Sequence, residues 1–212
     1  PHLPLGTDTF RAAALADRLA ARLPEALVAP PLPIGCSDEH AGFPGLLSLD
    51  AETLASVIVD CAGRMVAWGA RRLILLSAHG GNGRALERAA ARLTRELPDL
   101  RVWLPNDLLV VADAALEVGG GGDVPPEAVG LHAGEGETSE MLCLRPDLVR
   151  REYAAPGFVG DMEQVILKLR AAGLQPITAN GVLGDPTRAD AARGARYLDA
   201  RAAELAAALQ RE

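Results

Sequence analysis

The feature that most constrains the fold is a short apolar run followed at once by a glycine-rich turn and a helical pattern. Residues 73–76 are all apolar, with arginines before them and small residues after them, as in a strand that is buried on both faces. Glycines at 80, 81 and 83 end the run, and residues 84–96 then return to helical spacing. Together these make half of a parallel α/β unit, so the sequence predicts an α/β fold.

One histidine lies where such a unit places its ligands. In open parallel sheets, ligands gather beyond the carboxyl ends of the strands. His79 follows the predicted strand directly, in a turn of small residues that lets other groups approach its ring. We therefore predict that His79 takes part in the chemistry of this protein.

Size, charge and cysteine usage narrow the class of protein. A chain of 212 residues without an internal repeat predicts a single domain over 1–212. The 28 acidic residues outnumber the 21 basic ones, which argues against nucleic acid or an anionic membrane as the main partner. Three scattered cysteines favour a reducing compartment, and neither a membrane span nor a signal peptide is visible, so we expect a cytoplasmic protein.

Periodicity and chain breakers predict the remaining elements. Residues 106–122 have no clear period and end in four glycines, so we expect a mobile loop there. Asp8 or Thr9 is a candidate cap for the first helix. Helices are expected at 12–23, 50–69, 162–172 and 189–210, with another through 141–144, and short strands at 26–28, 46–49, 101–104 and 176–178.

The histidines suggest a metal site. A lone histidine in a loop is usually a solvated side chain, but here all four lie in loops beside glycine, proline or acids. Imidazoles and carboxylates that converge from several loops suit a bound metal ion. The histidines are His2, His40, His79 and His132.

Two acids have two interpretations each, and a third has a structural interpretation. Asp8 is either a helix cap or a carboxylate that bridges two ions, and Glu137 is either a first-turn acid favoured by the helix dipole or a ligand. Asp185 precedes proline and threonine, which is typical of a turn and cap that open the last helix.

Other chemistries have weaker signals. The turn 79–82 resembles a phosphate cradle, but both G-x-G-x-x-G and a Walker lysine are absent. A serine hydrolase would need a G-x-S-x-G elbow, which the sequence lacks. Cys36 near His40 suggests a thiol nucleophile, but a spacing of four residues in a loop does not establish that the two side chains are in contact.

Four blocks resemble motifs of the creatininase (creatinine amidohydrolase) family of binuclear metal amidohydrolases. Residues 1–8 match the end of E-Q-H-G-P-H-L-P-L-x-x-D, and residues 35–49 are similar to G-x-S-x-E-H-x-x-F-P-G-T-x-S-L. Residues 77–82 resemble N-G-H-G-G-N, and residues 132–139 resemble H-A-G-x-x-E-T-S. Residues 180–187 are most similar to the branch associated with mycofactocin biosynthesis, whose members are peptidases that release a modified C-terminal dipeptide from a ribosomally made precursor.

The resemblance implies a single three-layer domain, with a mostly parallel central sheet flanked by helices, and two divalent ions, Zn, Fe or Mn. Asp8 would bridge the ions, His79 would bind one of them, and Glu137 would supply the carboxylate on the other. His132 would shuttle a proton to the leaving amine beside Glu137. The residues expected to shape the pocket or orient the ligands are His2, Glu39, His40, Asn82 and Asp185.

Departures from the family pattern modify these expectations. The family's first Glu and His ligands lie just before the residue that matches Pro1, so we expect a truncated N-terminus and weak metal binding by residues 1–212 alone. Leu46 replaces a threonine, and Ser77-Ala78 replace Asn-Gly. Creatininases proper place a carboxylate where this chain has Gly81, which speaks against creatinine as substrate.

The expected function is therefore a metal-dependent peptidase that acts on a peptide or small amide and, by the family's habit, forms a homo-oligomer. One alternative is another amidohydrolase of the family, either a creatinine amidohydrolase or a formamide deformylase. The deformylase would recognise a phosphate through Arg188 and Arg193. The other alternative is a metal-free, non-catalytic scaffold.

Overall fold

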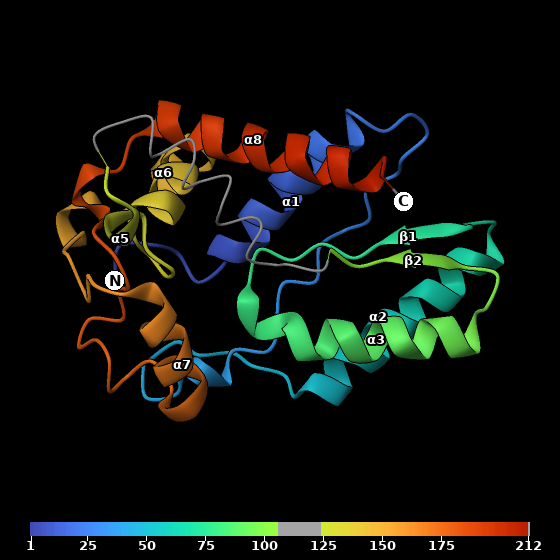
Figure 1. Ribbon diagram of the computed structural model, residues 1–212, viewed down its shortest axis with the longest axis horizontal. Helices are drawn as coiled ribbons and strands as arrows, with labels where there is room; N and C mark the ends of the chain where they lie inside the picture. The colour runs from blue at the N-terminus through green and yellow to red at the C-terminus, as the bar shows by residue number, and fades with distance from the viewer. Residues whose placement is uncertain (106–123, 212) are drawn as a thin grey trace.

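Three layers make up the centre of the computed structural model, which describes residues 1–105 and 124–211 (Figure 1). The middle layer is a parallel pair of strands in which Arg72 lies opposite Arg101 and Ile74 opposite Trp103. Helices cover both faces of this pair. The elements are β1 (Arg72–Ile74) and β2 (Arg101–Trp103), α2 (Ala51–Ala67) and α3 (Gly83–Glu96) on one side, and α1 (Thr7–Ala20) and α8 (Ala191–Leu209) on the other.

The apolar run after Arg72 is buried from both sides. Leu73 and Leu75 pack into the core formed with α2 and α3, whereas Ile74 and Leu76 pack against the cluster formed by α1 and α8. Because successive side chains of a strand point to opposite faces, this run joins the two cores. The predicted strand and the α/β fold class are confirmed.

A second group of helices lies beside these layers. α6 (Glu135–Leu144) packs against α1 and α8, and α5 (Pro126–Val129) precedes it. α7 (Met162–Ala172) contacts the short helix η1 (Asp38–His40). The other short helices are η2 (Gly80–Asn82), η3 (Pro146–Leu148), η4 (Arg151–Tyr153) and η5 (Pro186–Arg188).

The first helix begins earlier than its sequence pattern predicts. The carbonyl of Pro4 accepts hydrogen bonds from the Thr7 N–H at 3.1 Å and the Thr7 hydroxyl at 2.7 Å, so the chain already turns there. The helix therefore starts at Thr7 behind Gly6, and Asp8 lies in its first turn. The prediction that Asp8 or Thr9 caps this helix is wrong.

Three predicted strands are not formed. Residues 26–28 and 46–49 run as irregular chain, and Leu27 is 81% exposed. Prolines at 30, 31 and 33 have no N–H to offer a neighbouring strand. At 176–178 the N–H groups of Ile177 and Thr178 both bond to the Leu174 carbonyl, which makes a turn instead. The loop expected at 106–122 lies outside the described residues.

Candidate metal centre

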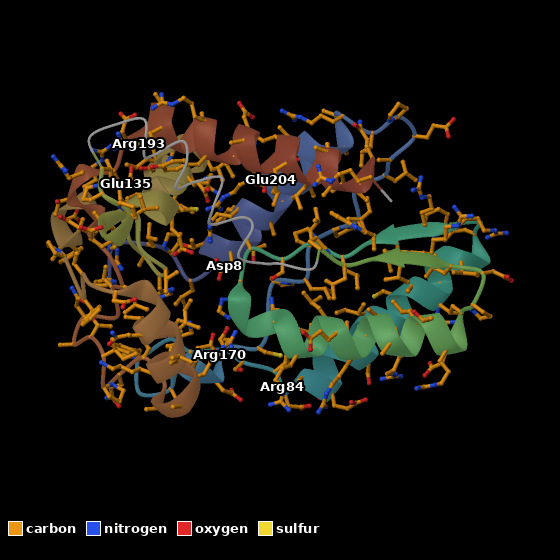
Figure 2. All side chains as sticks on the ribbon, viewed as in Figure 1. Asp8, Arg84, Glu135, Arg170, Arg193 and Glu204 are labelled. Atoms are coloured by element: carbon orange, nitrogen blue, oxygen red, sulfur yellow. The ribbon has the colours of Figure 1, made fainter. Side chains whose placement is uncertain are left out.

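Three segments far apart in sequence meet at one place. The Oδ2 atom of Asp8, in the first turn of α1, lies 3.3 Å from Nδ1 of His79, in the turn after β1. Arg11 Nη1 contacts Asp8 Oδ1 at 3.0 Å and Glu137 Oε1, at the start of α6, at 2.5 Å. Figure 2 shows Asp8 near the middle of the molecule, at the end of α1 that faces the start of α3. The structure thus brings together the three metal ligands expected from the sequence.

The hydrogen bonds of His79 determine which nitrogen can bind a metal. Its Nε2 lies 2.9 Å from the Cys36 carbonyl, which can only accept, so Nε2 carries the hydrogen. When this ring is neutral, the lone pair of Nδ1 faces the carboxylate of Asp8. Two acceptors 3.3 Å apart require a cation between them, either a proton or a metal ion. Imidazole and carboxylate suit Zn, Fe or Mn, so these residues fit the expected ions.

Burial and like charge shape the ionisation of the carboxylates. Burial and the neighbouring Glu137 raise the pKa of Asp8, although Arg11 opposes them. Burial also disfavours the charge on Glu137, but the Arg11 guanidinium outweighs it and holds the pKa of Glu137 at about 2. The pKa of His79 is raised because Glu39 and Asp8 outweigh burial, which opposes protonation. The site therefore holds an excess of negative charge that favours a cation.

The loop that carries η1 covers the other edge of His79. Glu39 Oε1 lies 3.0 Å from His79 Nε2, and the pKa of Glu39 is lowered because the hydrogen bonds from His40 and His79 outweigh burial. Asn82 joins this loop to the glycine turn, since its Oδ1 accepts from the Cys36 N–H at 2.8 Å. The structure places all three residues, Glu39, His40 and Asn82, around His79, where orienting residues were expected.

Three residues, Glu39, His40 and His79, lie close enough together to hold another metal ion. Ligand atoms of Glu39, His40 and His79 lie within 4.8 Å of one another. The Nε2 edge of His79, however, faces the Cys36 carbonyl at 2.9 Å and the Ser37 hydroxyl at 3.2 Å. We assign this edge to hydrogen bonding, because a protonated Nε2 has no lone pair for a metal.

His132 lies beside the same centre. Its Nδ1 is 4.0 Å from Glu137 Oε2, and its ring centroid is 4.5 Å from that of His40. The backbone of His132 is held by residues 180–187, because the Leu183 N–H donates to the His132 carbonyl at 2.8 Å. Burial lowers the pKa of His132 to about 4, so the ring is neutral at pH 7.

The two remaining candidates have different positions. His2 is fully buried, with Nε2 2.9 Å from the hydroxyl of Thr138, the residue after Glu137, and burial lowers its pKa to about 4. Asp185 accepts from the Thr187 N–H at 2.9 Å and the Thr187 hydroxyl at 2.6 Å. It caps η5, so the predicted turn and cap are present, but the prediction that they open the last helix is wrong because Asp190 caps α8.

Sequence reasoning missed Arg11 and Glu140, which are both buried next to this centre. A signal was present, because Arg11 follows Asp8 by three residues and Glu140 follows Glu137 by three, which places each pair on one helix face. Arg193, a candidate for binding phosphate, is instead engaged by Glu135 at 2.5 Å. That contact weakens the expectation of a phosphate-bearing substrate.

Comparisons with known proteins match most of the chain. The family model described as Creatininase, creatinine amidohydrolase, matches residues 1–209. A "Mycofactocin precursor peptide peptidase" of Mycobacterium tuberculosis is 38% identical over 209 residues, which covers 94% of this chain and 75% of that protein. A protein of the same name from Mycolicibacterium smegmatis is 35% identical over 201 residues, or 92% of this chain and 73% of that protein. A solved mutant creatininase described as "Zn-Zn type" is 25% identical with a TM-score of 0.74, over 99% of this chain and 84% of that chain.

Proposed function

The chain belongs to the creatininase family, and we propose that it is a metal-dependent peptidase of that family which releases the modified C-terminal dipeptide of the mycofactocin precursor. The observation that carries the proposal is the meeting of Asp8, His79 and Glu137, in which Asp8 Oδ2 lies 3.3 Å from His79 Nδ1 and can share a metal ion with it. The names of relatives up to 38% identical support a peptide as substrate.

The residues proposed to hold two divalent ions, Zn, Fe or Mn, are Asp8, His79 and Glu137. When bound, such ions would polarise the scissile carbonyl and lower the pKa of a water molecule toward neutrality. Arg11 holds one oxygen of Asp8 and one of Glu137, and the second oxygen of Asp8 faces His79. The Cys36 carbonyl and Glu39 fix the ring of His79 so that Nδ1 faces Asp8.

We assign the proton transfer to His132 beside Glu137. The lowered pKa of His132 keeps the ring neutral at pH 7, so the ring has a nitrogen lone pair that can take up a proton during attack on the amide. Its protonated form is then a strong acid that readily donates to the leaving amine. The side chain of His132 is 37% exposed, so a substrate can reach it.

Gly81 bears on the choice between a peptide and creatinine. A Cβ at this position would lie 2.4 Å from the Cys36 carbonyl oxygen and 2.5 Å from Glu39 Oε1. The space in which a side chain of residue 81 would begin is therefore filled by neighbouring groups. A carboxylate ligand at position 81, as in creatininases proper, does not fit this arrangement of the loop.

The test is an assay of the full-length protein loaded with Zn²⁺, Mn²⁺ or Fe²⁺. We expect release of a dipeptide from a precursor-like peptide ending in Val-Tyr, followed by mass spectrometry, and poor turnover of creatinine. His79→Ala should abolish both cleavage and metal retention. Creatinine hydrolysis without peptide cleavage would support the other amidohydrolases of the family, and a protein without metal or activity would support the scaffold.

Assembly and location are further parts of the proposal. Six large apolar side chains between α1 and α2 are exposed, and we propose that a second copy of this chain covers them: Leu27, Val28, Leu32, Ile34, Leu46 and Leu47. Within the described ranges, no helix is both long and apolar enough to span a membrane. A cytoplasmic location is supported by the free cysteines Cys36, Cys61 and Cys143.

A further inference from the structure

We propose that Arg11 is a positioning residue for the metal ligands and that the buried residues Glu140 and Arg201 hold it in place. Arg11 is 5% exposed, Glu140 is 0% exposed and Arg201 is 7% exposed. Arg11 Nε lies 2.6 Å from Glu140 Oε2, and Arg201 Nη1 lies 2.9 Å from Glu140 Oε1. The three side chains, from α1, α6 and α8, form a buried Arg–Glu–Arg group behind the centre.

The other end of the Arg11 guanidinium reaches the ligands themselves. Its Nη1 donates to Oδ1 of Asp8 at 3.0 Å and to Oε1 of Glu137 at 2.5 Å. Each carboxylate thus uses one oxygen for Arg11, and its second oxygen has another partner. Asp8 Oδ2 faces His79 Nδ1 at 3.3 Å, and Glu137 Oε2 accepts from the Ala133 N–H at 2.7 Å.

Arg11 also ties the ligands to the sheet. The same Nη1 donates to the Ala78 carbonyl at 3.1 Å, directly before His79. One nitrogen therefore links the first turn of α1, the turn after β1 and the start of α6. A guanidinium can serve several acceptors in fixed directions, whereas two carboxylates left without it would repel each other and turn apart.

Stability alone does not account for this group. Removing three charged side chains from water costs several kcal/mol for each ion, and well-packed apolar residues often stabilise a core equally well. Arg201 Nε has no hydrogen-bond partner among the described residues, so the burial of this group is incompletely compensated. A role in orienting the ligands explains why the charges lie here.

This inference rests on the proposed metal-dependent function, so the experiment begins with the metal affinity of the unsubstituted protein, called the parent. Competition with a chelator gives the affinity for Zn²⁺ or Mn²⁺, and peptide cleavage gives kcat and KM. Glu140→Gln keeps the shape of the side chain but removes the charge that holds Arg11. We expect the metal affinity to fall about tenfold, because loss of a residue that supports metal ligands typically costs about 10–100-fold in affinity or activity. We also expect kcat to fall and KM to change little.

Glu135→Gln is the matched control. Glu135 is also 0% exposed on α6, and it pairs with Arg193 of α8, beside which it lies in Figure 2. It does not belong to the Arg11 group, so its substitution should lower the free energy of unfolding while leaving the metal affinity at the parent value. The triple variant Arg11→Met/Glu140→Leu/Arg201→Met removes all three charges together and should fold, yet bind metal 10–100-fold more weakly.

The outcomes separate the two proposals. A parent that neither binds metal nor cleaves the peptide contradicts the proposed function. A metal-binding parent whose affinity and kcat are unchanged in Glu140→Gln, or in the folded triple variant, overturns the positioning role alone. If the triple variant does not fold, Glu140→Gln against Glu135→Gln decides, because both lose one buried charge from the same helix.

Discussion

At the scale of single residues, the ring of His79 is fixed by groups that approach it only because residue 81 has no side chain. The Cys36 carbonyl and Glu39 carboxylate lie 2.9 Å and 3.0 Å from its Nε2. A Cβ on Gly81 would lie 2.4 Å from that nitrogen. The glycine is therefore required for the orientation that directs Nδ1 at Asp8.

We predict that Gly81→Ala weakens metal binding by on the order of tenfold or more, because the new methyl group displaces the partners that orient the ligand. Overpacking of this kind also costs about 1–3 kcal/mol of stability. Metal content after dialysis and urea unfolding measure the two effects. The control is Gly80→Ala, since a Cβ there meets nothing within 4 Å. Equal metal retention by the two variants would contradict this account.

At the scale of elements, α6 and α8 pack so closely that their backbones nearly touch. A Cβ on Gly194 of α8 would lie 2.0 Å from the Ser139 carbonyl oxygen of α6. The same contact brings Ser139, Glu135 and Tyr197 together, with the Tyr197 hydroxyl 2.8 Å from Glu135. This spacing also fixes the distance across which Arg201 reaches Glu140.

Gly194→Ala should therefore destabilise the protein by about 3 kcal/mol or more, because backbone atoms cannot move aside as a flexible side chain does. The comparison is Gly63→Ala in α2, where a Cβ meets nothing within 4 Å and the better helix propensity of alanine should add up to about 1 kcal/mol. Urea denaturation of both variants beside the parent gives the two values. A Gly194→Ala protein as stable as the parent would show that the helices are farther apart.

At the scale of the whole molecule, the segment between α1 and α2 has the character of a contact surface. Leu27 is 81% exposed and Leu47 is 64% exposed, in a stretch that forms no strand. Large apolar side chains with this exposure are candidates for contact with another protein. In the proposed homo-oligomer, a second copy of the chain would cover these side chains.

We predict that light scattering after size exclusion gives the 212-residue chain a mass of at least twice its 22.1 kDa and that Leu27→Asp/Leu47→Asp lowers it. Burying two carboxylates in an apolar interface without partners is costly, so the assembly should dissociate. Leu167→Asp is the control, because Leu167 is 67% exposed but lies on α7, outside this segment. A monomeric parent, or an oligomer unaffected by the double substitution, would refute the assignment of this surface.

The sequence by itself determined the local features of this protein. The strand before His79, the helix after Gly83 and the turn at Asp185 follow from patterns within a few residues, because backbone geometry links periodicity to structure. The blocks around Asp8 and Glu137 likewise identify the family and its candidate ligands. The short apolar runs at 26–28 and 46–49 wrongly predicted strands, because these residues have no neighbouring strand to pair with among the described residues.

Only the tertiary structure decided how these ligands are held. Arg11 meets Glu140 across 129 residues and Ala78 across 67, and no local pattern specifies such contacts. The orientation of His79 depends on the Cys36 carbonyl, 43 residues away, and the position of His132 depends on Leu183. The physical reason is that hydrogen bonds and ion pairs act over a few ångströms in space, whereas sequence patterns report only what neighbours along the chain can do.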